Sequence, residues 1–403
     1  MTTEETKEMF VGIDTSKNDH QVSFLNQTKV KDDLKIGNDR SGFEELTEKL
    51  NSYKDNGYRI KVACEPTGHY WENLGRHLKE KDFTVEIVNP YHTSCYKELL
   101  DNSPQKDDKK DSRIISQLLK DERTLNNNLP EKPYAELREL THLREDLLED
   151  RNRLKNKLHK WLDRHFPEYP KLFSDVFGTT CLGLLKEYGG PEGIKEVDIK
   201  ELSEKVYSLS RGQLGLDRAR RIKNKAAETI GKRIAPTAAK VKLDHLLSRI
   251  TTLLERINQI EKLIKKHLNQ LEESRYLKSI PGVGWWGAAV FLGEVGDPTK
   301  MDKAKAVVKL AGLNLYRKQS GQSKSGLSIT RRGRSLLRKV AYQLAVASLD
   351  DNREFTDYYQ QKVDRGKEKQ NALVALSAKV LRVMYGVVKN GETYTPLEKR
   401  NLN

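Results

Sequence analysis

Cysteine is scarce in this sequence: 403 residues include only Cys64, Cys95 and Cys181. Their number is odd and they are far apart, so they form neither a disulfide framework nor a zinc-binding pattern. Three unpaired cysteines are typical of proteins from a reducing compartment. We therefore expect the chain to work in a reducing cytosol.

Long apolar segments are lacking as well. The first ten residues, MTTEETKEMF, have no apolar core of the kind that signal peptides carry, and no apolar run is long enough to cross a bilayer. We expect no membrane partner. Hydrophobic residues still make up 36% of the chain, which is enough for several modest cores, and the length favours two or three domains.

Negative charge is the minority sign. The chain has 73 Lys and Arg residues against 58 Asp and Glu residues, and its net charge is +15. This surplus predicts a polyanionic partner. One stretch, SRGQLGLDRARRIKNKAAETIGKRIAP, has few acidic residues, and we expect it to contact nucleic acid through Arg218, Arg220 and Arg221. A solvated helix face is the alternative.

Short β-type runs alternate with helical patterns in the first third of the chain. This alternation predicts an α/β sandwich with a mixed sheet, because the opening hairpin is not part of a purely parallel arrangement. We place this domain at residues 1–125. The predicted strands are a pair within 9–30, then 58–65 and 83–90, and the predicted helices are 42–53 and 66–82.

Two seven-residue repeats of apolar residues mark the middle of the chain, which we delimit as a helical coiled-coil region at 126–273. The helices could pair within one chain or across a dimer, and a plain helical bundle is the alternative. A helical C-terminal domain follows at 274–403. The repeats consist of Leu140, Leu147, Leu154 and Trp161 with Leu137 and Leu158, and of Leu243, Ile250, Ile257 and Ile264 with Leu246, Leu253 and Ile260.

Four acidic residues of the first third stand out against the basic background. Asp14 lies in FVGIDTSK, Glu65 in KVACEPTGHY, and Asp108 and Asp111 in QKDDKKDSRII, three apart at the start of an expected helix. Carboxylates gathered this way repel one another unless they hold divalent cations. We therefore predict a two-ion Mg²⁺ site for phosphoryl transfer, with Mn²⁺ as a substitute. Turn capping and helix-dipole roles are the alternatives.

Two further motifs belong to the C-terminal domain. The run SIPGVGWWGAA resembles a helix-hairpin-helix, whose turn at Gly282 and Gly284 offers backbone amides to a phosphate. Trp285 and Trp286 could stack on bases or pack in a core. The second motif, a polar loop, holds Ser320. It is flanked by cations suited to a phosphodiester, namely Arg317, Lys318, Arg331, Arg332 and Arg334. By itself this is an ordinary basic loop, because no histidine lies beside the serine as a base.

These motifs, in this order, resemble the DEDD/serine transposases of insertion sequence family one-hundred-ten, which a bridge RNA guides. The resemblance covers nearly the whole chain. It rests on GIDTSK, EPTGHY, VNP and a KxDxxD block in the first third, and on IPGVG, AGL followed by SG at Ser320, RxGxxxLR and the C-terminal RGKEKQNALVALSAKVLRVMYGVVKNGETY.

The resemblance implies a RuvC-like domain whose metal ligands are Asp14, Glu65, Asp108 and Asp111. It also implies that Ser320 is the nucleophile that joins to DNA. The acidic block departs from the family pattern, so Asp107 competes with Asp108 as the third ligand. The segment 167–240 is longer than in compact family members, and its role stays open.

The resemblance further implies double-stranded DNA and a structured RNA as partners, a homodimer or tetramer, and a bacterial, nucleoid-associated protein. Two alternatives remain. A junction-resolving endonuclease would use water in place of Ser320 and form no protein–DNA adduct. A non-catalytic nucleic-acid-binding protein would tolerate removal of the acidic residues.

Overall fold

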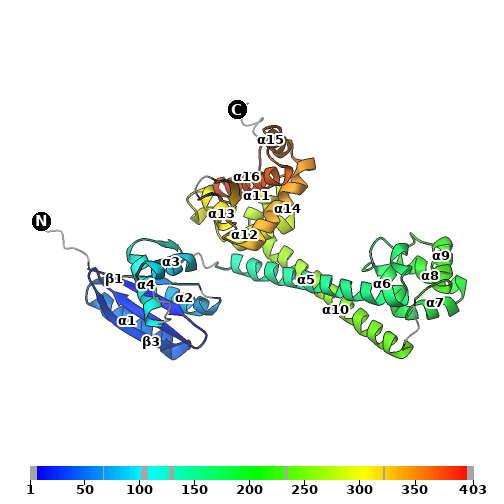
Figure 1. The fold of residues 1–403 in the computed structure, drawn as a ribbon, viewed down its shortest axis with the longest axis horizontal. Helices are drawn as coiled ribbons and strands as arrows, with labels where there is room; N and C mark the ends of the chain where they lie inside the picture. Colours follow the sequence, from blue (N-terminus) through cyan, green and yellow to red (C-terminus); the bar gives the residue numbers. More distant parts are fainter. Residues whose placement is uncertain are drawn as a thin grey trace. The chain divides into compact units, whose positions relative to one another are not determined.

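The computed structural model describes residues 7–66, 68–100, 108–126, 131–231, 235–320 and 323–396 (Figure 1). The chain divides into two compact units, Met1–Leu129 and Pro130–Asn403. The predicted domain limits at residues 125 and 273 both stay predictions.

Unit 1 is built on a mixed sheet with the strand order β3-β2-β1-β4-β5-β6. Strands β1, β4 and β5 run parallel, whereas β2, β3 and β6 join by antiparallel pairing. The predicted mixed α/β architecture is confirmed in this form. The strands are β1 Lys7–Thr15, β2 Asp19–Leu25, β3 Val30–Gly37, β4 Tyr58–Cys64, β5 Val85–Val88 and β6 Thr124–Asn126.

Helices cover both faces of this sheet. The side chains of Met9, Val11 and Ile13 in β1 share a core with helices α1 (Arg40–Asp55) and α2 (Tyr70–Glu80). The alternate β1 side chain, Phe10, packs against the opposite layer, where α4 (Asp108–Lys120) is joined by α3 (Pro90–Leu100). This two-residue alternation is what a strand buried on both faces requires.

Gly12 is the point of closest approach between β1 and α4. A Cβ atom at this position would lie 2.2 Å from the backbone oxygen of Ser112 and 2.3 Å from the backbone nitrogen of Ser116. Both neighbours are helix backbone and cannot rotate away. The absence of a side chain at Gly12 therefore sets how near the helix lies to the strand.

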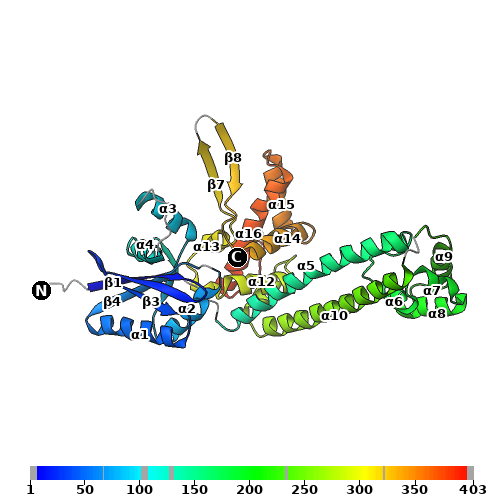
Figure 2. The same ribbon diagram turned by 60° about the horizontal axis from the view of Figure 1, so that its bottom comes forward.

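Unit 2 is almost entirely helical. Its longest helices are α5 (Tyr134–His165) and α10 (Pro236–Asn269), which lie side by side and antiparallel (Figures 1 and 2). The Arg144 guanidinium lies 2.7 Å from the Glu261 carboxylate, and the Trp161 indole donates to the Ala239 carbonyl at 3.0 Å. The two predicted seams therefore pair within the chain. Leu140, Leu147, Leu253 and Ile260 are only half-buried.

Two cores lie at opposite ends of this helix pair. The distal core is formed by α5 and α10 with α6 to α9, and the C-terminal core by the opposite ends of α5 and α10 with α11 to α16. The bounds are α6 Thr179–Tyr188, α7 Pro191–Glu196, α8 Ile199–Leu209, α9 Leu216–Ala227, α11 Glu273–Lys278, α12 Trp285–Val295, α13 Ala304–Leu310, α14 Ser335–Asp351, α15 Arg353–Asp364 and α16 Lys369–Asn390, with 3₁₀ turns at Tyr169–Leu172 and Pro298–Lys300.

By length and composition alone, helix α16 is long and apolar enough to cross a membrane. The sequence had led us to expect no such apolar run. Its apolar side chains, among them Leu376, Leu381 and Met384, are buried in the C-terminal core. Such packing is the ordinary reason for a strongly apolar helix in a helical domain.

Gly12→Ala tests the close approach of α4. We expect a loss of about 1–3 kcal/mol in the unfolding free energy of unit 1, because the methyl group must displace helix backbone. Gly386→Ala, where a Cβ meets open space within α16, is the matched control and should not destabilise unit 2. Differential scanning calorimetry compares the two. An unchanged transition in Gly12→Ala would contradict the tight β1–α4 contact.

Candidate nucleic-acid-cleaving site

Asp14 and Glu65 come at neighbouring positions at the carboxyl ends of two parallel strands. Strands β1 and β4 pair up to Ile13 opposite Cys64, so the next residue on each side is an acid. The Glu65 amide donates to the Ile13 carbonyl at 3.4 Å, and the Thr15 hydroxyl donates to the Glu65 carbonyl at 3.2 Å. These bonds hold the two acidic residues together at one sheet edge.

Both positions face the α4 layer. In β1 the alternate positions Phe10 and Gly12 contact α4, so Asp14 continues that face. In β4, Ala63 belongs to the same layer, and Glu65 lies two residues farther on. The pattern that places apolar side chains beneath α4 thus places both acids on that side of the sheet.

Helix α4 begins at the same edge. The last residue of α4, Lys120, donates to the Gln27 carbonyl. Gln27 follows the end of β2, and that end of β2 pairs with the first half of β1. Arg113 pairs with Asp33 at the level of Gly12, so the helix runs opposite to β1. The backbone of Asp108, one turn before Ser112, therefore lies toward the edge that bears Asp14 and Glu65.

Asp111 makes a different contact. Its carboxylate binds the Lys97 amine of α3 at 2.6 Å, with 17% of the Asp111 side chain exposed. The side chain of Asp108 and all of Asp107 lie outside the described residues. Within the described part of the chain, no three His, Cys, Asp or Glu side chains form a metal-binding group. The four-carboxylate site stays a prediction.

The donors at this edge are nevertheless hard oxygen ligands, the type that Mg²⁺ prefers. Asp111 already holds a cation, the Lys97 ammonium group. The Cys64 side chain packs in the opposite core with Val11 and Ile13, so it supplies no thiolate ligand to this edge. The residues present therefore fit a hard divalent cation such as Mg²⁺ better than a soft, thiolate-binding metal ion.

Ser320 lies on a hairpin rather than in the irregular loop that the sequence suggested. Strand β7 (Leu315–Ser320) pairs with β8 (Ser323–Ile329), and Ser320 opposes Ser323 at its far end. Figure 2 shows the hairpin projecting from the helices of unit 2. The side chains of Ser320, Arg317 and Lys318 lie outside the described residues.

The root of this hairpin is held by backbone and arginine contacts. The Thr330 amide donates to the Asn314 carbonyl at 2.9 Å, and the Arg331 amide to the Gly312 carbonyl at 3.0 Å. Arg338 donates to the carbonyls of Ala311 and Arg331 at 2.9 and 3.3 Å. Arg331, with a positive φ of 53°, is exposed, as is Arg332.

Arg334 has a partner that the sequence did not reveal. Its guanidinium donates to the Glu294 carbonyl and lies 3.5 Å from the Glu294 carboxylate, which is 1% exposed. His142 of α5 binds the same carboxylate at 2.6 Å. The contact explains Arg334 as part of the hairpin root, so we no longer propose it as a phosphate contact.

Charge balance holds this group together. Burial would raise the pKa of Glu294, but the His142 hydrogen bond and the Arg334 charge outweigh it and keep the pKa below its usual value. The same carboxylate raises the pKa of His142, and burial lowers the pKa of Arg334 to about 10. Glu294 lies in an apolar helix, and its partners His142 and Arg334 are 152 and 40 positions away in the sequence, so no sequence pattern indicated these contacts.

The glycine turn connects α11 to α12. Gly282 has a φ of +85°, and a Cβ there would lie 2.7 Å from the Ser348 backbone, so this glycine packs against α14. Gly284 is exposed at the start of α12. Trp286 has the Arg144 guanidinium 4.1 Å from its ring centre, and Trp285 has the Lys265 amine at 4.6 Å. These cations attach α12 to the helix pair.

The three predicted arginines of α9 differ. Arg218 donates to the Leu172 carbonyl at 2.9 Å and is a structural contact. Arg220 makes one long contact, 3.9 Å, with Asp217 and remains largely exposed. Arg221 is exposed. Of these three arginines, Arg220 and Arg221 stay candidates for binding nucleic acid.

Comparison with known proteins gives a consistent result. Residues 11–167 match the DEDD-type IS110 family described as Transposase, and residues 274–360 match the Transposase IS116/IS110/IS902 family. The chain is 25% identical over 296 residues to a 43.6 kDa protein of insertion element IS110 from Streptomyces coelicolor, covering 72% of each chain.

Two other relatives extend this comparison. The pilin gene-inverting protein of Moraxella bovis is 22% identical over 403 residues, covering 97% of this chain and 98% of that protein. The transposase for insertion sequence element IS1111A of Coxiella burnetii is 27% identical over 173 residues, covering 42% and 46%.

The α/β unit with acids at its sheet edge, together with these matches, defines an enzyme that acts on DNA, a transposase. The chain belongs to the IS110 family, and the resemblance found in its motifs is confirmed.

Glu294→Gln tests the hairpin root. We expect a loss of about 3–5 kcal/mol in unfolding free energy, because Arg334 would keep its charge in a buried place without a countercharge. The control is Glu272→Gln, which removes an exposed contact to Arg275 and should change stability little. Urea unfolding measures both. Equal effects of the two substitutions would show that the Glu294 contacts are not stabilising.

Proposed function

We propose that this transposase cleaves, exchanges and rejoins DNA strands through a covalent serine–DNA intermediate. The observation that carries the proposal is the adjacency of Asp14 and Glu65 at the edge where α4 begins. The family membership supports it, because the two matched segments, 11–167 and 274–360, contain the acidic residues and Ser320.

Ser320 would act as the nucleophile. Its hydroxyl loses its proton to the solvent as the oxygen attacks the scissile phosphorus, the bond from phosphorus to the 3′ oxygen breaks, and the 3′ oxygen takes up a proton to leave as a free hydroxyl. The phosphoserine ester keeps the energy of the phosphodiester. A 3′ hydroxyl of another strand then attacks this ester and releases serine, so rejoining needs no ATP.

The carboxylates would hold Mg²⁺, with Asp14 and Glu65 from the sheet and Asp108 and Asp111 from α4. When bound, the metal supplies positive charge to the phosphate under attack. The exposed Arg331 and Arg332 at the hairpin root would bind backbone phosphates of the DNA beside the hairpin. For Asp111 to serve as a ligand, the Lys97 amine must give up its 2.6 Å contact.

Rejoining distinguishes this proposal from simple hydrolysis. The Moraxella relative is named a pilin gene-inverting protein, and an inversion requires that cut strands be joined again. We extend strand exchange to this chain. A structured bridge RNA would choose donor and target DNA, and a dimer or tetramer would let the carboxylates of one chain serve the serine of another.

We propose a location in the cytoplasm, because the substrate of a bacterial transposase is DNA of the cell. Cys64, Cys95 and Cys181 are free, which suits a reducing compartment.

Asp14→Asn tests the metal site. Cleavage should fall by at least about 100-fold, because one charge that would hold the metal is lost, while the fold persists. Chelation with EDTA should stop the wild-type enzyme in the same way. Asp55→Asn, at an exposed position of α1, is the control for a lost carboxylate. Comparing Asp107→Asn with Asp108→Asn identifies the third ligand. Normal recombination by Asp14→Asn in Mg²⁺ would contradict the assignment of Asp14 as a metal ligand.

Ser320→Ala tests the nucleophile. We expect strand exchange and the protein–DNA adduct to vanish while DNA and RNA binding persist, since a nucleophile must lie about 3–3.5 Å from phosphorus and in line with the leaving oxygen. Denaturing gels followed by peptide mapping detect the linked residue. Ser323→Ala and Ser325→Ala are the matched controls. An adduct at either of these serines would identify a different nucleophile, and cleavage without any adduct would favour a water-using resolvase.

A further inference from the structure

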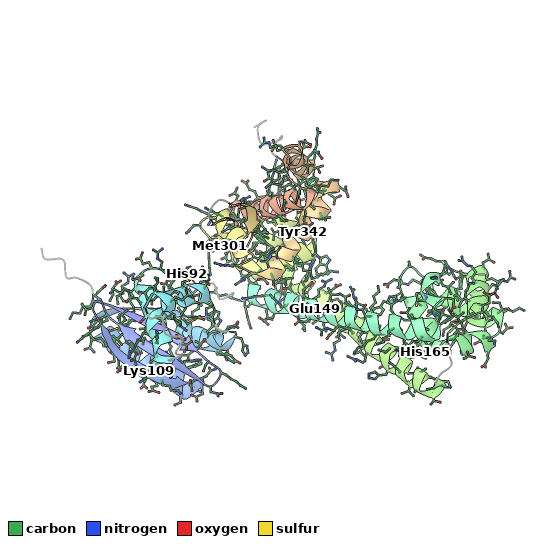
Figure 3. The ribbon with its side chains drawn as sticks, in the orientation of Figure 1. His92, Lys109, Glu149, His165, Met301 and Tyr342 are labelled. Atoms are coloured by element: carbon green, nitrogen blue, oxygen red, sulfur yellow. The ribbon has the colours of Figure 1, made fainter. Side chains whose placement is uncertain are left out.

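The charge of α5 changes sign halfway along the helix. Residues 134–150 contain six acidic and two basic residues, whereas residues 151–165 contain six basic and one acidic residue. Figure 3 labels Glu149 near this change and His165 at the end of the basic half. A solvated helix ordinarily intersperses the two signs, because opposite charges three or four residues apart stabilise it.

Three cations of the basic half form an exposed row. Lys157, Lys160 and Arg164 follow one another at three- and four-residue steps and flank the buried Leu158 and Trp161. Within the described part of the chain, no acidic side chain pairs with any of the three. We call them the distal basic row.

The neighbouring cations are already neutralised. Arg153 contacts Asp150 at 3.1 Å, and Lys155 contacts Asp175 at 2.8 Å. The distal basic row is thus the part of the helix where positive charge is left without compensation. Like charges at these steps cost helix stability, so an external polyanion would relieve a repulsion that the fold tolerates.

The length of the row suits a phosphate backbone. Seven residues of helix rise about 10 Å, and over that distance one strand of DNA presents about three phosphates. The acidic half of α5 beside it would repel the same backbone. Contact is therefore confined to the distal half and does not extend along the whole helix.

The position of the row also separates it from the C-terminal core. Helix α12 packs on α5 at Arg138, where a Cβ on Gly293 would lie 2.8 Å from the Arg138 amide nitrogen. From Arg138 to Lys160 the helix rises about 33 Å, the length of about ten base pairs of duplex. Residues 168–273, which follow the row, lie outside both family matches.

We propose that Lys157, Lys160 and Arg164 bind the phosphate backbone of duplex DNA, about one helical turn of DNA away from the C-terminal core. The partner is DNA because the enzyme acts on DNA. The exposed Arg220 and Arg221 lie on α9, which packs in the same distal core. The proposal rests on the family's DNA substrate and not on the chemistry of Ser320.

The test compares two triple variants of the full chain. Lys157→Gln, Lys160→Gln and Arg164→Gln together remove the distal basic row. Arg256→Gln, Lys262→Gln and Lys266→Gln together remove the same charge from exposed positions of α10. These positions lie in the half of α10 that leads to the C-terminal core. Circular dichroism and melting temperature confirm that each variant folds. If the first triple variant does not fold, the single variants Lys157→Gln and Lys160→Gln are used in its place.

Binding to a duplex of about 40 base pairs of arbitrary sequence is measured across a salt series, because phosphate contacts are independent of sequence. We expect the first variant to lose about 10-fold or more in affinity and to lower the salt slope by about 2–3, whereas the control stays within about 2-fold of wild type.

Three results would overturn the proposal: an unchanged salt slope in the first variant, equal losses in both variants, or a loss seen with a structured RNA of similar length but not with duplex DNA. Binding is measured without cleavage. A failure of this test therefore leaves the Ser320 mechanism untouched, and a failure of the Ser320 test leaves this one untouched.

Discussion

The apolar seam between α5 and α10 is the contact on which unit 2 depends. One end of the seam contributes Leu137, Ile264 and Leu268 to the C-terminal core. The other end contributes Leu158 and Ile250 to the distal core. Because the same two helices enter both cores, the seam fixes the distance between them. A pair of long helices buries too little surface to be stable alone, and here each end is secured by a separate cluster.

The sequence predicted the parts of unit 1 that follow simple periodicity. The strands that end at Asp14 and Glu65 are apolar runs, and their parallel pairing brings the two acids together as expected. Strand β3 was missed because its residues, VKDDLKIG, include Asp32 and Asp33 and are mostly half-exposed at the sheet edge. Strand β6 has three residues, too few to show a period.

Cations were harder to assign than apolar residues. Arg218 and Arg334 carry the same charge as Arg220 and Arg221, but the first two bind a carbonyl or a carboxylate of the fold. A side chain's partner depends on which segments fold beside it, and Arg334 and Glu294 are 40 positions apart in sequence. The segment from α6 to α9 connects α5 to α10 and brings the chain back beside α5. The pairing of the two seams within one chain therefore could not be predicted without the fold of that segment.

The hairpin that bears Ser320 acts as a lever. Ser320 is the last of the six residues of β7, so it lies about 17 Å from the start of the strand at Leu315. A rotation of about 10° at the root therefore carries the end of β7 through about 3 Å, which is as large as the distance over which a nucleophile attacks phosphorus. Small changes in the angle at the root are therefore magnified at the end of β7. Under the proposed serine mechanism, contacts at the root that never touch DNA would then influence how accurately strands are exchanged.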